Sequence, residues 1–374
     1  MAKIVKKFGG TSLQTEKRIK LAVEEVIEGI ENGNEVISVV SALGRGGDPY
    51  ATDTLIDLMK EISPEIDPLK QDLMMSCGEV ISASLFSHYL DAAGYDSVPL
   101  TGSQAGIITD REFGEARIVD INTERMLEYM AQDKSVVLAG FQGITKKGEI
   151  TTLGRGGSDT TALEIGGALN ADKVEVYTDV PGVAVVDPHR VKDPPFFDAI
   201  PRGVLRKLSN NGTSVIHPRA ISAANQYEIP FSIKCSWGSG ETLVNGRPSS
   251  AKTPLAVAVK DDCSLVRVSN FDSKKNAGSG KSTERVVAKG NEGKFYLLEG
   301  ESKRRVQDFN SRPASLVTAV STLPERSNTL LSKVLDVVGR EHYVEKKVGS
   351  SLVKFIVEPG MESEVVRRIY NRFY

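Results

Sequence analysis

The stretch KIVKKFGGTS, residues 3–12, contains the pattern that decides the fold. KIVKKF predicts a strand, and the adjacent glycines Gly9 and Gly10 follow it directly, ahead of a helix predicted over 15–32. Adjacent glycines permit a tight turn that brings backbone N–H groups close to a ligand, and the N-terminus of a following helix favours negative charge. Because Lys7 adds a positive charge at the same point, the stretch indicates a phosphate-binding turn.

A plain tight turn with Lys7 exposed to solvent is the other interpretation of this stretch. The residues match neither GxxxxGK[ST], the P-loop pattern, nor GxGxxG, the dinucleotide-binding pattern. A strand, two glycines and a helix are only weakly specific by themselves, so both interpretations stay open at this point.

The alternation of strand and helix continues through the first half of the chain. The helix over 15–32 has apolar residues at helical spacing and Gly33 to stop it. Further elements are predicted in the order strand, helix, strand, helix, strand over residues 35–41, 78–93, 98–101, 121–132 and 135–141. This repetition predicts an α/β fold with a mostly parallel central sheet between helix layers, with anion sites at the carboxyl ends of strands.

A second glycine-rich segment, TTLGRGGSDTTA at 151–162, also leads into a predicted helix. In it, Arg155 can pair with a carboxylate, Ser158 can donate a hydrogen bond, and Asp159 can orient a lysine or a metal ion. Two glycine-rich anion loops in one α/β domain are much less expected by chance than one. A third segment, VYTDVPGVAVVDP at 176–188, predicts a strand, a turn and a second strand.

Composition narrows the class of protein. The chain has 374 residues, 40% of them hydrophobic, which suffices for a full core in more than one domain. A formal charge of −2 gives no global attraction to nucleic acid or to an anionic membrane. Three scattered cysteines, four scattered histidines and the lack of a long apolar run predict a cytoplasmic protein with free thiols, no zinc site and no membrane segment.

The segment VNGRPSSAKTP, residues 244–254, interrupts the periodicity with Gly, Pro and Ser. We expect a domain boundary there, between a domain of residues 1–245 and a smaller α+β region of residues 250–374.

The last part of the chain predicts the order strand, helix, strand, strand, helix over residues 315–374. This order resembles an ACT domain, a small fold that pairs with a second copy to bind amino acids between them. Residues 256–310 would form the other, degenerate copy, because 273–294 looks irregular. A small α+β module used only for dimerisation is the alternative interpretation.

Several ordered blocks carry a family resemblance. Over roughly residues 1–237 the chain resembles the aspartate kinase branch of the amino-acid kinases. The blocks are KFGGTS (7–12), VVSALGRGGDPYATDTL (39–55), CGEVISASL (77–85), PLTGSQAGIIT (99–109), EARI (115–118), LAGFQGITKKGEITTLGRGGSDTTA (138–162), TDVPGV (178–183), IHPRAI (216–221) and IPFSIKCS (229–236).

The resemblance implies a role for individual residues. Lys7 would stabilise the transferring phosphoryl group, Asp159 would orient Lys7, and Glu79 would bind the α-amino group of L-aspartate. Arg155 would pair with a substrate carboxylate, with donors nearby at Ser41, Thr52 and Ser158. The residues implied for nucleotide contact are Gly9, Gly10, Gly156, Gly157, Thr178, Asp179, Gly182, His189 and Ser214.

These implied roles agree with the physics of phosphoryl transfer, which depends on positioning and charge neutralisation, with ATP as donor and Mg²⁺ as clamp. The implied set contains no metal ligand from the protein. For Glu79 a structural alternative stays open, namely a carboxylate near a helix start that interacts with the helix dipole.

The nucleotide half departs from the family pattern. Aspartate kinases of the usual type have an aromatic residue at the position of Ala184, an arginine at that of His189 and a lysine at that of Ser214. They also have an acidic residue near Lys207. The acceptor half is intact, whereas the donor half lacks a stacking surface and two cations.

The leading hypothesis is therefore MgATP-dependent phosphorylation of the L-aspartate side chain in lysine, threonine or methionine biosynthesis, or for a related metabolite. A non-catalytic regulatory homologue that keeps the amino-acid pocket is the second hypothesis. A kinase for another amino acid or nucleotide is the third. A homo-oligomer, a dimer through the ACT-like region, is the expected assembly.

Overall fold

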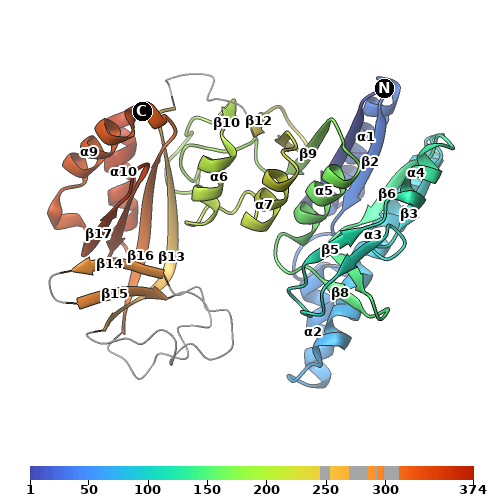
Figure 1. Cartoon of the computed structure of the whole chain (residues 1–374), viewed down its shortest axis with the longest axis horizontal. Coiled ribbons are helices and arrows are strands. Elements are labelled where there is room, and N and C mark those ends of the chain that lie inside the picture. Colours follow the sequence, from blue (N-terminus) through green and yellow to red (C-terminus); the bar gives the residue numbers. More distant parts are fainter. Residues whose placement is uncertain (245–252, 269–284, 291–292, 299–310) are drawn as a thin grey trace. The chain divides into compact units, whose positions relative to one another are not determined.

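The computed structural model describes residues 1–244, 253–268, 285–290, 293–298 and 311–374 (Figure 1). The chain forms two compact units, the first from Met1–Val183 and Val215–Asn245 and the second from Ala184–Ser214 and Gly246–Tyr374. The predicted boundary segment lies mostly outside the described residues. Residues 184–214 group with the second unit, whereas the sequence placed them in the first domain.

The central sheet of the first unit has the strand order β12-β11-β9-β1-β2-β6-β3. All neighbouring pairs in this order are parallel except β11 and β12. The predicted mostly parallel sheet is therefore confirmed. Its strands are β1 (Lys3–Phe8), β2 (Glu35–Val40), β3 (Ser97–Leu100), β6 (Ser135–Ala139), β9 (Lys173–Thr178), β11 (Phe231–Cys235) and β12 (Glu241–Val244).

Helices cover both faces of this sheet. Phe8, Val40 and Val137 from the strands pack with Val26 and Phe86 into one buried core under α1 (Glu16–Glu31) and α3 (Pro68–Ala92). On the other side α5 (Gly157–Ala168) contacts β1, β2 and β9, and α7 (Pro218–Gln226) lies beside α5 (Figure 1). The helix layers that the sequence predicted are present.

Neighbouring residues of a strand point to opposite faces, and β1 shows this with two lysines. Lys6 faces α1, where its Nζ lies 3.8 Å from Glu25 Oε2 and 3.6 Å from Glu175 Oε2. Burial lowers the pKa of Lys6, although the two carboxylates oppose that shift. Lys7 faces α5. Strand β1 thus directs Lys6 toward the carboxylates of Glu25 and Glu175, and Lys7 toward α5 at the carboxyl end of the sheet.

Helix α3 begins earlier than the predicted start at residue 78. Pro68 occupies its first turn, and the Asp67 side chain accepts hydrogen bonds from the N–H groups of Leu69 and Lys70. The prediction was wrong because this capping sequence was not recognised. Glu79 therefore lies in the middle of the helix and not at its start.

A smaller sheet of the first unit has the order β5-β4-β7-β8. Asp72 of α3 holds it, since its carboxylate accepts from Gly114 N at 2.9 Å, from Thr152 N at 2.7 Å and from Thr152 Oγ1 at 2.9 Å. The remaining elements of this unit are η1 (Gly10–Leu13), α2 (Thr52–Ile62), β4 (Ile107–Thr109), β5 (Ile118–Ile121), α4 (Glu124–Met130), β7 (Gln142–Thr145) and β8 (Ile150–Thr152).

The second strand predicted within 176–188 is absent as a strand. After β9 the chain turns at Gly182, where φ is +116°, and then makes only an isolated bridge between Ala184 and Phe196. The backbone of Val185 instead donates to Pro195 O and accepts from Val257 N. This prediction was wrong because the apolar residues after the turn pack in an irregular segment.

The second unit contains an antiparallel sheet of order β14-β15-β13-β16-β18-β17. Its last part has the predicted order strand, helix, strand, strand, helix. Within 273–294, residues 285–290 form β14, and most of the rest lies outside the described residues. The elements of this unit are β10 (Ala199–Ile200), α6 (Arg202–Ser209), β13 (Leu255–Val268), β14 (Arg285–Gly290), β15 (Gly293–Leu298), β16 (Ser311–Ser321), η3 (Pro324–Arg326), α9 (Ser327–Val338), η4 (Arg340–His342), β17 (Glu345–Val348), β18 (Leu352–Val357) and α10 (Glu362–Phe373).

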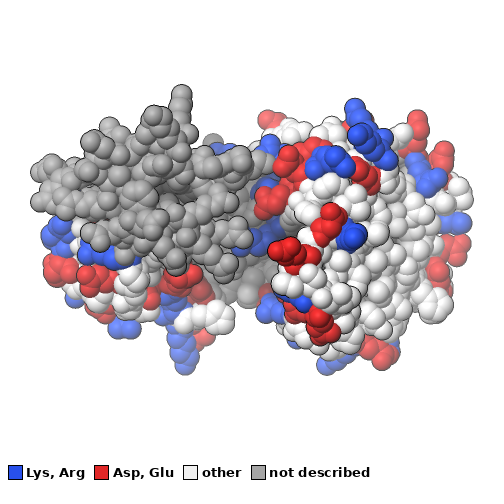
Figure 2. All heavy atoms as spheres, turned by 90° about the horizontal axis from the view of Figure 1, so that it is seen from below, with Lys and Arg blue, Asp and Glu red and all other residues white. Residues whose placement is uncertain are grey.

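On the face drawn in Figure 2, the basic and acidic side chains of the described residues are interspersed. None of the helices in the described part of the chain is long and apolar enough to cross a membrane.

We expect Asp72→Ala to lower the free energy of unfolding by about 2–4 kcal/mol, because it leaves buried N–H groups without an acceptor. Urea denaturation measures this change. Asp57→Ala is the control, since the Asp57 side chain is 66% exposed and its removal should change the value by less than about 0.5 kcal/mol. Equal losses in the two variants would contradict the role given to Asp72.

Candidate active site

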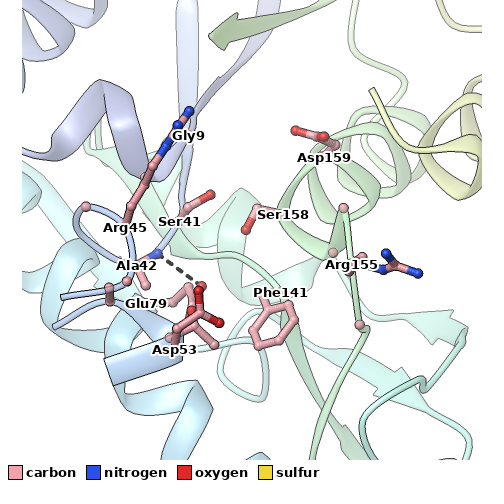
Figure 3. A pocket seen from close by; sticks show the side chains of 18 of the residues that line it. Gly9, Ser41, Ala42, Arg45, Asp53, Glu79, Phe141, Arg155, Ser158 and Asp159 are labelled. Atoms are coloured by element: carbon pink, nitrogen blue, oxygen red, sulfur yellow. Dashed lines mark hydrogen bonds between the residues drawn. The ribbon is translucent and has the colours of Figure 1, made fainter. Parts of the chain in front are cut away.

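A cavity of about 560 Å³ opens at the carboxyl ends of β1 and β2, beside the first turn of α5 (Figure 3). This is the edge where a parallel sheet is expected to bind ligands. All of its lining residues belong to the first unit. They are Lys7, Gly9, Gly10, Ser41, Ala42, Gly44, Arg45, Gly46, Ala51, Thr52, Asp53, Glu79, Phe141, Gly154, Arg155, Gly156, Gly157, Ser158 and Asp159.

Lys7 and Asp159 form an ion pair in the wall of this cavity. Lys7 Nζ lies 2.5 Å from Asp159 Oδ1, and the two residues are only 8% and 9% exposed. At this distance the ammonium and the carboxylate attract each other strongly, and the surrounding burial screens that attraction little. The interpretation of Lys7 as a solvent-exposed lysine is therefore wrong.

Of the two adjacent glycines, Gly10 is required by the close approach of another loop, whereas a Cβ on Gly9 would have its nearest neighbour, Lys7 Nζ, at an ordinary 3.4 Å. A Cβ on Gly10 would lie 2.5 Å from Gly44 O and 2.8 Å from Ala42 O, which are backbone atoms that cannot move aside freely. The Gly44 N–H donates to Gly10 O at 3.0 Å. The short 3-10 helix η1 begins at Gly10 itself, with Gly9 as its N-cap, and α1 begins only at Glu16. The turn therefore presents backbone N–H groups without a long helix immediately behind them.

Glu79 is the more deeply buried of the two buried acids in the site and is 3% exposed, against 9% for Asp159. Its Oε1 accepts a hydrogen bond from Ala42 N at 3.0 Å, the contact drawn in Figure 3, while its Oε2 is buried without a partner among the described residues. Burial raises the pKa of Glu79 from 4.5 to about 8, against the effect of the Ala42 hydrogen bond. The alternative of a carboxylate at a helix start is wrong, because α3 begins at Pro68. An unpartnered carboxylate oxygen in a cavity wall is suited to a ligand ammonium group.

The loop before α5 supplies the other polar groups. Gly154 and Gly156 adopt left-handed conformations, with φ of +72° and +70°, on either side of Arg155. Ser158 lies in the first turn of α5 and is buried. Figure 3 shows the Arg155 guanidinium directed away from Glu79. In this state the arginine is at the rim of the cavity and not engaged with its floor.

Sequence reasoning missed Arg45, Asp53 and Phe141, which also line the cavity. The sequence did contain a signal for Arg45, since LGRGG occurs at both 43–47 and 153–157. Phe141 has a left-handed backbone with φ of 69°, which a sequence does not reveal.

Two of these residues show how the cavity wall is held. Arg45 Nη2 lies 2.6 Å from Asp179 Oδ2, so it connects the loop after β2 with the end of β9. Phe141 donates its N–H to Thr161 Oγ1 and accepts at its carbonyl from Leu153 N, which stabilises its unusual conformation.

The residues that the sequence assigned to the site divide into three groups. The cavity brings together Lys7, Asp159, Ser41, Thr52, Glu79, Arg155, Ser158, Gly9, Gly10, Gly156 and Gly157. Thr178, Asp179 and Gly182 belong to the same unit but do not line the cavity, although Asp179 contacts it through Arg45. His189 and Ser214 belong to the second unit, where both are exposed.

Among the described residues, no group of three or more His, Cys, Asp or Glu side chains could hold a metal ion. Magnesium commonly keeps water and substrate phosphate oxygens as ligands, with one or two carboxylates. The cavity is therefore compatible with a magnesium ion that arrives bound to phosphates.

The chain is similar to known proteins in its sequence. A family model described as the amino acid kinase family matches residues 2–235. Aspartokinase 1 of Bacillus subtilis is 42% identical over 248 residues, which are 66% of this chain and 61% of that protein. The chain thus spans about three fifths of the length of this relative. Aspartokinase 2 of the same organism is 34% identical over 98% of this chain and 88% of its own length.

Solved structures agree with the fold. Aspartokinase III of Escherichia coli, solved in complex with aspartate and ADP, superposes with a TM-score of 0.78 at 19% identity, over 98% of this chain and 99% of that one. Aspartate kinase from Synechocystis gives a TM-score of 0.60 at 26% identity, over 100% of this chain and 69% of that one.

Burial of Glu79 predicts a pH dependence of stability. Between pH 4.5 and about 8 the folded protein keeps a proton on Glu79 that the unfolded chain releases, so stability falls as pH rises through this window. Glu79→Gln removes that contribution. As pH rises from 5 to 8, we expect the free energy of unfolding of the variant to increase by on the order of 2–5 kcal/mol relative to that of the unaltered protein. Denaturant unfolding at each pH measures this difference. If the free energies of unfolding of the two proteins changed in parallel with pH, the prediction of a raised Glu79 pKa would be wrong.

Proposed function

The chain belongs to the amino acid kinase family and, within it, to the aspartokinases, and we propose that it transfers the γ-phosphoryl group of ATP to the side-chain carboxylate of L-aspartate. The observation that carries this proposal is the cavity that holds the Lys7–Asp159 ion pair in one wall and the unpartnered carboxylate of Glu79 in another. The similar E. coli enzyme binds aspartate and ADP in its crystal structure, which supports the choice of substrates.

The acceptor amino acid binds between Glu79 and the loop before α5. Its ammonium group pairs with Glu79, which loses its proton as the cation replaces the missing partner. Arg155 turns toward the cavity and holds a carboxylate of the ligand in a two-point contact. Ser41, Thr52 and Ser158 also line the cavity and can donate hydrogen bonds. This arrangement selects a small amino acid with a second acidic group.

Phosphoryl transfer then needs position and positive charge. An oxygen of the side-chain carboxylate attacks the γ-phosphorus, the bond to the β,γ-bridging oxygen breaks, and ADP and an acyl phosphate are formed. Lys7 stabilises the charge on the transferring group, and Asp159 keeps the ammonium in place through their ion pair. Gly9 and Gly10 present backbone N–H groups to phosphate oxygens. Mg²⁺ bound to those phosphates would neutralise further charge.

A second candidate function is a regulatory homologue that binds the amino acid but does not turn over nucleotide. The substitutions Ala184, His189 and Ser214 favour it, because they remove donor-side groups of the usual aspartokinase pattern. A kinase for another amino acid or nucleotide is a third candidate. Under the leading proposal, the product serves lysine, threonine or methionine biosynthesis, the protein is cytoplasmic, and dimers form through the ACT-like region.

Trapping with hydroxylamine tests the proposal directly, since it converts an acyl phosphate into a coloured hydroxamate. We expect hydroxamate with ATP, Mg²⁺ and L-aspartate, and a 10²–10³-fold lower rate in Lys7→Met, because one preorganised charge is lost. Lys20→Met is the control, since that side chain is 57% exposed on α1. L-Aspartate binding in calorimetry without any hydroxamate would favour the regulatory homologue instead.

The donor side predicts weak ATP binding. A missing aromatic stack costs roughly 0.5–1.5 kcal/mol and an unreplaced charge-assisted hydrogen bond roughly 1.5–3 kcal/mol. We expect calorimetry to show weaker binding of ATP than of L-aspartate, and His189→Arg with Ser214→Lys to strengthen ATP binding about tenfold or more. L-Aspartate affinity should not change in this double variant. Micromolar ATP binding by the unaltered protein, with no gain in the variant, would show that other residues supply these contacts.

A further inference from the structure

The segment IHPRAI, residues 216–221, has no role in the proposed chemistry. It nevertheless contacts residues Leu153–Gly157, which lead into α5 and which we call the acceptor loop. His217 is the N-cap of α7, Pro218 is its first residue, and the ring Nδ1 of His217 accepts from Arg219 N at 3.4 Å. Helix α7 packs beside α5, the helix that the acceptor loop enters. The start of α7 is therefore placed against the residues that precede Asp159.

Arg219 grips the backbone of that loop. Its Nη1 donates to Leu153 O at 2.7 Å, and its Nη2 donates to Glu115 Oε2 at 2.7 Å. The other side of Leu153 is also held, because its N–H donates to Phe141 O at 2.9 Å. The residue two positions before Arg155 is thus fixed on both of its polar groups.

His217 closes the other end of the loop by contact. A Cβ on Gly156 would lie 2.1 Å from His217 Cβ, so the backbone at Gly156 lies directly against the histidine. Burial lowers the pKa of His217, and the neighbouring cations Arg219 and Arg155 lower it further, although Asp159 and Glu115 oppose them. A neutral ring can accept the Arg219 N–H bond that caps α7.

Arg155 lies between these two points of support. Its neighbours Gly154 and Gly156 both have left-handed backbones, a conformation that does not itself fix a loop, because glycine adopts many others at low cost. What fixes the backbone position of Arg155 is therefore the support on either side. That support comes from side chains of α7 and its N-cap, neither of which lines the cavity.

We propose that Arg219, together with His217, is a positioning residue that sets the Leu153–Gly157 loop and so holds the backbone of Arg155 where its side chain can turn to the carboxylate of the acceptor amino acid. The inference rests on the proposed function for the identity of that acceptor. The contacts that carry it involve only residues of the first unit. We call the contacts of Arg219 and His217 with the acceptor loop the clamp. Loss of the clamp should weaken acceptor binding more than it weakens nucleotide binding.

The test compares Arg219→Met, Arg219→Lys and the control Arg125→Met in the full chain, since Arg125 is exposed on α4 and does not line the cavity. We expect Arg219→Met to raise the KM for L-aspartate about tenfold or more while the KM for ATP changes less than twofold. Arg219→Lys should recover part of the loss, because one donor to Leu153 O remains. Equal changes in both KM values, or no change in either, would overturn the proposal.

Hydrogen exchange measured by mass spectrometry separates this inference from the proposed function. Faster exchange of amides in residues 153–158 is expected in Arg219→Met without any ligand, with no such change in Arg125→Met. If the unaltered protein shows neither turnover nor L-aspartate binding, the proposed function fails, but this exchange difference still tests the clamp. Unchanged exchange in a folded Arg219→Met protein would overturn it.

Discussion

The ion pair between Lys7 and Asp159 is the constraint on which the rest of the first unit depends. Two charges this deeply buried are stable only when they are paired, so the end of β1 has to meet the first turn of α5. Lys6 adds a second condition, because its partners Glu25 and Glu175 lie on the opposite face. Together the two lysines define which face of β1 each helix layer covers. The cavity lies on the Lys7 side, where the Lys7 side chain forms part of its wall.

Much of this arrangement could be predicted from sequence, because the pattern that specifies it is local. The strand at 3–8, the glycine pair and the LGRGGSD loop each show their own chemistry. The start of α3 was missed because its signal is a single Asp-Pro cap and not an apolar period. Phe141 was missed since a left-handed backbone on a bulky residue is imposed by distant hydrogen bonds to Thr161 and Leu153.

Three charged residues of the cavity differ in whether they already have a partner inside it. Lys7 has its partner, whereas Glu79 lacks a cation and Arg155 is turned outward. A ligand with one ammonium and two carboxylate groups supplies what the second and third of these residues lack. Recognition of this kind places most specificity in groups that are costly to leave unpaired. Each of the two LGRGG loops contributes an arginine, Arg45 or Arg155, to the lining of this cavity.

The division of the chain has a consequence for gene fusion and module exchange. Residues 184–214 fold with the C-terminal sheet, since Val257 N donates to Val185 O and Lys207 Nζ donates to Ser351 Oγ at 2.7 Å. The chain passes from the first unit to the second after Val183 and again after Asn245. A chimera joined only after Asn245 would therefore place a foreign C-terminal sheet against the parent residues 184–214 at these contacts. Gly212, whose Cβ would lie 1.9 Å from Val259 O, leaves no room for a mismatched strand. Recombination that preserves folding therefore has to carry both pieces together.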